Sequence, residues 1–291
     1  MSKTIIFFGT DTFSASALTA LIEADYTIGA VITKPDSKSG RGQRVTAPLV
    51  KQIAIEHNIL VWQPTKLSDA IDQIKALGDV IGVLSSYGKI VPQAIIDLFH
   101  PGIINIHPSL LPLYRGPSPI ETAIINGDEQ TGVSIMKLTA EMDAGPVYAQ
   151  EVCELDGTET APQLYDELSA LGGRMLIETL PSIIEGNLLP SPQSNAAIFC
   201  YLLKKEDAFL KPEKITAVQA QRHVRAYLAF PKSKLTVLDQ PVIITKAHVS
   251  EEKQTALDIA FEGGQFLSID ELIGPSGRSM SGNAFLNGYK P

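Results

Sequence analysis

Cysteine is scarce in this sequence, and its scarcity excludes two kinds of structural support. Of 291 residues, 2 are cysteines, Cys153 and Cys200. They lie far apart in the chain, and neither has the paired spacing of a zinc ligand set. The sequence therefore predicts no disulfide framework and no metal site.

Long hydrophobic runs are also missing. The chain opens MSKTIIFFG, where one lysine is followed by an apolar run too short for a signal-peptide core or a membrane span. This opening is more typical of a first β-strand. We therefore expect a cytoplasmic protein with no membrane partner.

Positive charge is in deficit over the whole chain. The 24 Lys and Arg are outnumbered by 32 Asp and Glu, which gives a net charge of −8 and argues against non-specific nucleic-acid binding by the whole surface. The deficit is uneven, because residues 204–234 hold eight basic and three acidic side chains, a local net charge of +5. Such a segment suits phosphate contact, although a solvated helix face is the commoner explanation of a charge run.

The first half of the chain alternates apolar, β-branched runs with segments of helical spacing. This alternation favours an α/β fold: a Rossmann-like, mostly parallel sheet with helices on both faces. The expected elements are strand 4–8, helix 13–23, strand 27–33, helix 49–56, strand 79–84, helix 92–98, strands 102–106, 133–138 and 147–155, and a long helix 161–185.

The last third of the chain has a different pattern. Beyond residue 206, a helical stretch near 216–228 is followed by short strand candidates and turn signals, which predict a small C-terminal β-barrel of the OB-like kind. Before it, residues 187–195 contain two prolines and little periodicity. The predicted domains are a catalytic domain at 1–189, a linker at 190–205 and the barrel at 206–291.

Polar side chains follow the strand predicted at 102–106. Pro108 disfavours helical geometry in the residue before it, so His107 is expected to be extended, and Asn105 then points to the same face. In open α/β sheets, ligands bind beyond the carboxyl ends of the strands. An amide and an imidazole at such a position can polarise a carbonyl group and stabilise an oxyanion.

An acid that could orient this histidine is Asp143, in the sequence MDAGP. Small residues beside it allow close approach, and a carboxylate near His107 favours the charged imidazolium. From spacing alone, a structural histidine and a turn aspartate are the commoner explanations, and they stay open at this point.

A helix is predicted after the proline-rich loop. Ser118, Pro119 and Glu121 have the pattern of a capping box, and Asn126-Gly127 would end the helix.

These motifs resemble those of the 10-formyltetrahydrofolate-dependent formyltransferases. The resemblance covers nearly the whole chain and is strongest over residues 4–150. The family's Asn-x-His, its HPSLLP run and its Arg-Gly step are matched within residues 105–116, and its later aspartate by Asp143. The resemblance implies that Asn105, His107 and Asp143 are the catalytic residues of a formyl transfer that needs no metal.

The resemblance also implies a binding site for 10-formyltetrahydrofolate as co-substrate. SSYGKIVP, at residues 85–92, is similar to the segment that lines the folate pocket. The expected pocket residues are Leu84, Tyr87, Gly88, Ile90, Ser109, Leu110, Leu111 and Pro112.

The second implied substrate is a nucleic acid. KPDSKSGRGQRV, at residues 34–45, is similar to a loop of the tRNA-directed branch that contacts the acceptor end. The resemblance therefore implies an enzyme that formylates methionine on initiator methionyl-tRNA in translation initiation, with a tRNA-binding barrel. We expect it to be a monomer. The expected tRNA contacts are Lys38, Arg41, Arg44, Lys204 and Lys205.

Four other functions would each account for part of this sequence. A sugar-nucleotide N-formyltransferase would share the three catalytic residues, but the Gly-Arg-Gly loop argues against it. A glycinamide-ribotide transformylase would lack the second domain. A dinucleotide-dependent oxidoreductase would need the G-x-G-x-x-G turn, which FFGTDTF lacks. A non-catalytic RNA-binding protein stays open until the effect of replacing His107 on formylation is known.

Overall fold

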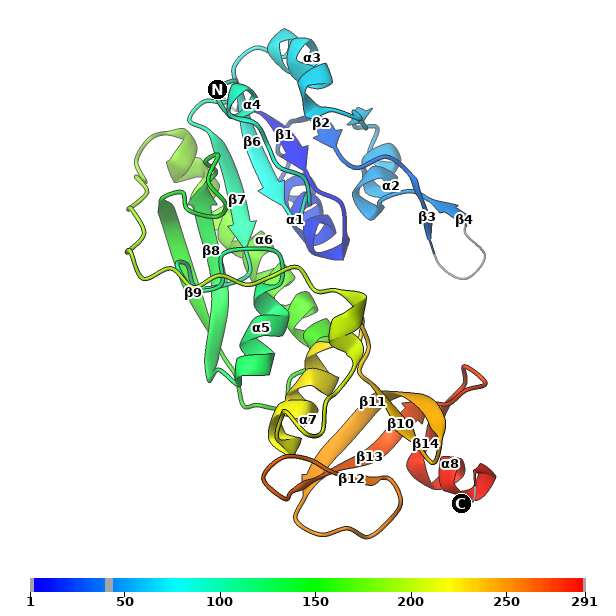
Figure 1. Ribbon diagram of the computed structural model, residues 1–291. Coiled ribbons are helices and arrows are strands. Elements are labelled where there is room, and N and C mark those ends of the chain that lie inside the picture. The colour runs from blue at the N-terminus through cyan, green and yellow to red at the C-terminus, as the bar shows by residue number, and fades with distance from the viewer. Residues whose placement is uncertain (1–2, 40–43, 290–291) are drawn as a thin grey trace. The chain divides into compact units, whose positions relative to one another are not determined.

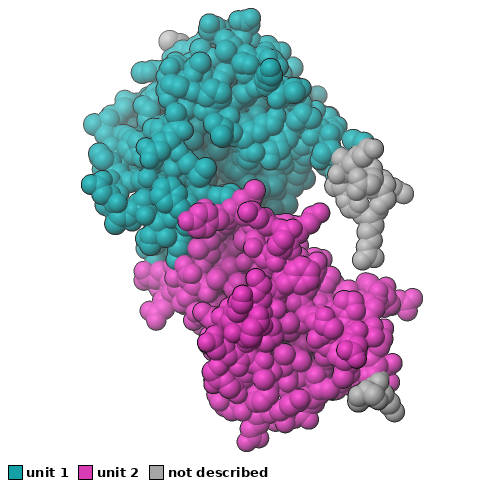
Figure 2. All heavy atoms as spheres, in the orientation of Figure 1, with its two compact units in different colours: residues 1–117, 131–153, 165–199 teal, residues 118–130, 154–164, 200–291 magenta. Residues whose placement is uncertain are grey.

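The structure is a computed structural model that describes residues 3–39 and 44–289 (Figure 1). Contacts between residues divide the chain into two compact units, which are coloured separately in Figure 2. Neither unit is a continuous stretch of sequence. Unit 1 comprises residues 1–117, 131–153 and 165–199, and unit 2 comprises residues 118–130, 154–164 and 200–291. The domain limits at residues 189 and 206 stay a prediction.

A seven-stranded sheet forms the centre of unit 1, in the order β5-β2-β1-β6-β7-β8-β9. Neighbouring strands from β5 to β7 are parallel, and β8 is antiparallel to β7. β6 and β7 are buried along their whole length, as expected for strands covered on both faces. The predicted mostly parallel sheet is confirmed. The strands are β1 (Thr4–Phe8), β2 (Ile28–Ile32), β5 (Val61–Trp62), β6 (Val80–Ser85), β7 (Ile103–His107), β8 (Gln130–Lys137) and β9 (Val147–Glu154).

Helices pack on both faces of this sheet. On one face, η1, α3 and α4 share a hydrophobic core with Ile6 and Phe8 of β1 and Ile103 of β7. Successive side chains of a strand point to opposite faces, so Ile106 points away from that core. Gly172 of α6 lies against Ile106, which places α6 on the second face. The helices are α1 (Thr12–Glu23), α2 (Leu49–Glu56), η1 (Leu67–Ala70), α3 (Ile71–Ala76), α4 (Gln93–Ile96) and α6 (Ala161–Ile184).

An antiparallel sheet forms the main part of unit 2, in the order β10-β11-β13-β12, with β14 also paired to β13. Its apolar face packs against Ala217, Ala220 and Val224 of α7 and against Phe285 of α8. This strand-rich part is compatible with the predicted small barrel-like domain. The elements are α5 (Pro119–Asn126), η2 (Lys205–Ala208), α7 (Ala217–Ala226), β10 (Lys234–Val237), β11 (Gln240–Ser250), β12 (Asp258–Ala260), β13 (Phe266–Ile273), β14 (Ser279–Ser281) and α8 (Gly282–Gly288).

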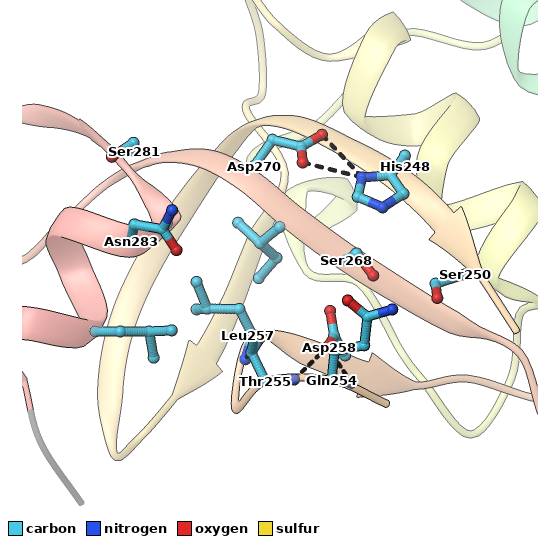
Figure 3. A pocket seen from close by; sticks show the side chains of 13 residues that line it. His248, Ser250, Gln254, Thr255, Leu257, Asp258, Ser268, Asp270, Ser281 and Asn283 are labelled. Atoms are coloured by element: carbon cyan, nitrogen blue, oxygen red, sulfur yellow. Dashed lines mark hydrogen bonds and ion pairs between the residues drawn. The ribbon is translucent and has the colours of Figure 1, made fainter. Parts of the chain in front are cut away.

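A polar cavity of about 230 Å³ lies within unit 2, and Asp258 is at its edge (Figure 3). Asp258 Oδ2 accepts hydrogen bonds from the main-chain N–H groups of Gln254 at 2.7 Å and Thr255 at 2.6 Å. Burial alone would raise the pKa of the Asp258 carboxyl. Hydrogen bonds from Ser268 and from these main-chain groups outweigh burial and hold the pKa below its usual value. The charged carboxylate thus fixes the turn that leads into β12.

The long helix occurs where its periodicity predicted it. α6 ends at Ile184, one residue before the predicted end, and Gly186 follows with a φ of 76°. Neither α6 nor any other helix within residues 3–39 and 44–289 is long and apolar enough to cross a membrane.

The capping box predicted at Ser118 is wrong. Helix α5 does begin at Pro119, and Gly127 ends it with a φ of 70°. The side chain of Ser118, however, makes no capping hydrogen bond, and its hydroxyl donates to the carbonyl oxygen of Tyr201. A tertiary acceptor has therefore replaced the local one that the sequence pattern suggested.

Candidate active site

Asn105 and His107 lie at the carboxyl end of β7, inside the sheet. Asn105 is in register with Leu84 of β6 and Met136 of β8, and His107 is in register with Ser134. Their exposed fractions are 4% and 5%. Because strands flank β7 on both sides, the backbone that carries these two side chains is held by hydrogen bonds along both edges.

The loop that follows β7 determines the proton position on His107. Nε2 of His107 lies 3.0 Å from the carbonyl oxygen of Tyr114, a residue with a φ of 57°. A carbonyl oxygen can only accept, so this geometry requires a hydrogen on Nε2. Nδ1 is then the ring nitrogen that is left to interact with an acid.

That acid is Asp143, in the turn between β8 and β9. Its Oδ2 lies 3.8 Å from His107 Nδ1, within ion-pair distance but beyond a hydrogen bond. The same oxygen accepts a hydrogen bond of 2.8 Å from the main-chain N–H of Gly116. The turn is tight, because a Cβ at Gly145 would lie 1.8 Å from the carbonyl oxygen of Lys137. The structure thus brings all three predicted catalytic residues together in unit 1.

A set of short hydrogen bonds stiffens the loop between His107 and Tyr114. The Ser134 hydroxyl donates to the carbonyl oxygen of Ser109 at 2.6 Å and accepts from the N–H of Leu111 at 3.0 Å. Gln150 Nε2 donates to the carbonyl oxygen of Leu111 at 2.8 Å. Side chains from β8 and β9 therefore hold the main chain of the loop in place.

Chemically, this arrangement suits a carbonyl substrate. The amide of Asn105 can donate a hydrogen bond to a developing oxyanion, and an imidazolium beside it can stabilise the same negative charge electrostatically. Within residues 3–39 and 44–289, no group of three or more His, Cys, Asp or Glu side chains is placed to hold a metal ion.

Comparison with known proteins shows the family to which this chain belongs. Residues 2–180, more than half of the chain, match the Formyl transferase family. This chain belongs to the formyl transferase family. A methionyl-tRNA formyltransferase of Chloroflexus aurantiacus is 38% identical to it, with 98% of this chain and 96% of that protein covered. Another, of Pseudoalteromonas translucida, is 37% identical, with 98% and 93% covered.

A solved structure shares the fold of this formyl transferase. HypX from Aquifex aeolicus in complex with tetrahydrofolic acid superposes with a TM-score of 0.70 at 16% identity. The comparison covers 99% of this chain and 48% of HypX, so the chain spans about half the length of that protein. At this identity the likeness shows the fold alone.

The residues predicted to line a folate pocket have unequal exposure in this formyl transferase. Tyr87 is 1% exposed and packs edge-on against Phe8 in the core, with ring centroids 5.7 Å apart. Ile90, by contrast, is 82% exposed. Ser109, Leu111 and Leu84 are buried, Leu110 and Pro112 are half-buried, and Gly88 has a φ of 67°.

The residues predicted to contact tRNA lie in three segments. Arg41 lies outside the described residues. Lys38 and Arg44 lie on β3 (Ser37–Ser39) and β4 (Arg44–Thr46), a two-stranded antiparallel sheet. Lys204 and Lys205 are exposed at the start of η2 in unit 2.

Sequence reasoning missed two side chains beside Asp143. Arg115, at 8% exposure, donates to Gln193 Oε1, and Gln193 Nε2 donates to the carbonyl oxygen of Asp143 at 2.8 Å. In the sequence, Arg115 stands out only as part of the Arg-Gly step, and Gln193 lies in the predicted linker. A single glutamine in a proline-rich stretch carries no sequence signal of such a role.

Proposed function

We propose that this protein transfers the formyl group of 10-formyltetrahydrofolate to the α-amine of methionine on initiator tRNA. Full-length similarity to proteins named methionyl-tRNA formyltransferase supports this assignment. The observation that carries it is the 3.8 Å separation between His107 Nδ1 and Asp143 Oδ2 at the carboxyl end of β7, the strand that also carries Asn105.

The reaction is an acyl transfer without a covalent enzyme intermediate. The neutral amine attacks the formyl carbon and forms a tetrahedral oxyanion. The bond from that carbon to the folate nitrogen then breaks, the folate nitrogen gains a proton and the attacking nitrogen loses one. The products are the N-formylated methionyl-tRNA and tetrahydrofolate.

Asn105 and His107 act on the oxygen of the formyl group. Asn105 donates a hydrogen bond from its side-chain amide, and protonated His107 stabilises the negative charge of the intermediate. Donors of this kind each contribute roughly 3–4 kcal/mol, or about 10²–10³ in rate. The buried position of both side chains favours this role, because electrostatic stabilisation is stronger where water is excluded.

Asp143 places its carboxylate beside the imidazole of His107 and helps to remove the proton of the attacking amine. The 3.8 Å separation between its Oδ2 and His107 Nδ1 is long for a hydrogen bond, and catalytic hydrogen bonds often tighten only when substrate is bound. The attacking amine must be uncharged, so activity falls at acidic pH as the amine becomes protonated.

The folate is proposed to occupy a largely apolar site next to Asn105. Leu84 is in register with Asn105, so it places an apolar side chain on the same face. Gly88, with no side chain, allows the pterin ring to approach the main chain, whose N–H and C=O groups match the ring edge.

The tRNA is proposed to contact the basic loop of residues 34–45 and the basic segment that starts at Lys204 and Lys205. Of the segment's cations, Arg222 donates to the carbonyl oxygen of Asn126, and Arg225 donates to that of Glu159. Those two arginines are thus bound to their own unit, which favours the exposed lysines for phosphate contact.

A formylation assay tests this function. The purified protein is incubated with initiator tRNA charged with methionine, with and without 10-formyltetrahydrofolate. We expect formyl-methionyl-tRNA to appear only when the folate is present, and much more slowly with charged elongator tRNA. Formylation of an amino-sugar nucleotide without formylation of charged tRNA would refute the assignment.

A further inference from the structure

One side chain joins the two loops that carry the active site. We infer that Gln193 is a positioning residue, which sets Asp143 and, through it, His107; this inference rests on the proposed function. Gln193 lies in unit 1, in the stretch after α6 that the sequence predicted as a linker.

The carboxamide of Gln193 has its full set of hydrogen bonds. Nε2 donates to the carbonyl oxygens of Asp143 at 2.8 Å and Gly145 at 2.7 Å. Oε1 accepts from Nε of Arg115 at 3.0 Å and from its Nη2 at 2.8 Å. A carboxamide has two N–H donors and two acceptor lone pairs, so Gln193 uses its whole hydrogen-bonding capacity here.

This bonding pattern permits only one orientation of the carboxamide. A flipped Gln193 would face its oxygen toward two carbonyl oxygens and its NH₂ group toward a guanidinium, so all four hydrogen bonds would become repulsive contacts. The side chain is therefore rigid as well as fully paired. Rigid support of this kind is what a catalytic carboxylate needs.

Asp143 is held from both of its ends. Gln193 binds its main-chain carbonyl, and the N–H of Gly116 binds its carboxylate at 2.8 Å. Gly116 is the residue after Arg115, whose guanidinium is bound to Gln193. These bonds form a closed ring through Asp143, Gly116, Arg115 and Gln193.

The backbone of this ring needs such support. Asp143 has a φ of 47°, in the left-handed region that is unfavourable for residues other than glycine. Gly116 has a φ of 123°, where glycine is the residue best tolerated. Without the bonds from Gln193, the turn would lose the contacts that offset this strain.

The segment that carries Gln193 is itself anchored at both ends. Ser191 and Val147 exchange two main-chain hydrogen bonds of 2.8 Å. Ile198 donates to the carbonyl oxygen of Pro112 at 3.1 Å and accepts from the N–H of Arg115 at 2.9 Å. Gln193 thus extends from a segment that is fixed to the start of β9 and to the loop after His107.

Two substitutions of equal size separate positioning from packing. Gln193→Glu keeps an acceptor for Arg115 but loses both donors to the Asp143 turn, and Gln193→Met keeps the volume but loses all four bonds. We expect both to lower kcat for formylation by about 10²-fold, a loss that a 1 Å misplacement can cause, and to leave the KM for charged tRNA and for folate unchanged. Ser194→Ala, at the exposed neighbouring position, is the control and should retain full kcat.

Crystal structures of both variants supply a readout that needs no activity. We expect Asp143 Oδ2 to lie farther from His107 Nδ1 than 3.8 Å and its bond to Gly116 to be lost. An unmoved Asp143, a retained kcat in Gln193→Glu, or a change confined to KM would each overturn the inference. If the unsubstituted protein forms no formyl-methionyl-tRNA, the proposed function fails, and the position of Asp143 still decides the role of Gln193.

Discussion

At the scale of the residue, backbone conformation matters as much as side-chain identity. Tyr114, Gly116 and Asp143 have φ angles of 57°, 123° and 47°. In these conformations the Tyr114 carbonyl reaches Nε2 of His107, while the Gly116 N–H and the Asp143 carboxylate meet on its other side. The imidazole is therefore held between a fixed acceptor and a fixed acid.

The charge of Asp143 can be tested separately from its shape. Asp143→Asn keeps the size of the side chain and an oxygen that can accept from Gly116, but it removes the negative charge beside His107. We expect kcat to fall by about 10²–10⁴-fold, the range for loss of acid–base assistance. The thermal unfolding midpoint should stay near that of the unsubstituted protein. A kcat that survives this substitution would mean that Asp143 has a structural role only.

The sequence predicts some of these residues and not others, for physical reasons. Asn105 and His107 were predictable, because Pro108 and the alternation of a strand are local rules. The catalytic role expected for Asp143 comes from the family resemblance, because its spacing in the sequence is equally typical of a turn residue. Gln193 was missed, because its four hydrogen bonds are all to residues distant in the sequence, and no local sequence pattern predicts such bonds.

At the scale of the element, length decided what the sequence could predict. The 24 residues of α6 show a helical period, whereas β5 has two residues and β3 and β4 have three each. A period cannot be read from so few positions. The capping box predicted for α5 is wrong for another reason, because the Ser118 hydroxyl donates to the carbonyl oxygen of Tyr201.

The turn before β12 offers a test of stability at this scale. Replacing Asp258 with Ala removes the acceptor of two main-chain N–H groups, those of Gln254 and Thr255. Hydrogen bonds to a charged group contribute about 1.5–3 kcal/mol each, so for two bonds we expect a loss of roughly 3–6 kcal/mol in the free energy of unfolding of unit 2 at neutral pH. Urea unfolding, followed by a probe in unit 2, measures this difference.

The pH dependence of that loss has a definite sign. The pKa of Asp258 is lowered by folding, so its contribution is fully present above the unfolded value of about 4 and is lost as pH falls toward the folded pKa. The difference between the unsubstituted protein and Asp258→Ala should therefore shrink below about pH 4. A difference that stays constant through this range would contradict the account.

At the scale of the whole molecule, the proposed catalytic residues and the basic segment belong to different units. The three proposed catalytic residues all lie in unit 1, while Lys204 and Lys205 lie in unit 2. Substitutions at the catalytic residues should thus alter the chemical step, and substitutions at the lysines should alter tRNA binding and its dependence on salt.

The most direct measurement is the single-turnover rate of formyl transfer by His107→Ala, with its affinities for charged initiator tRNA and folate measured on the same preparation. We predict that the rate falls by about 10²–10³-fold, as for loss of one oxyanion donor, while both affinities stay unchanged. An unchanged rate, or a loss of affinity that accounts for the whole effect, would contradict the claim that His107 stabilises the intermediate.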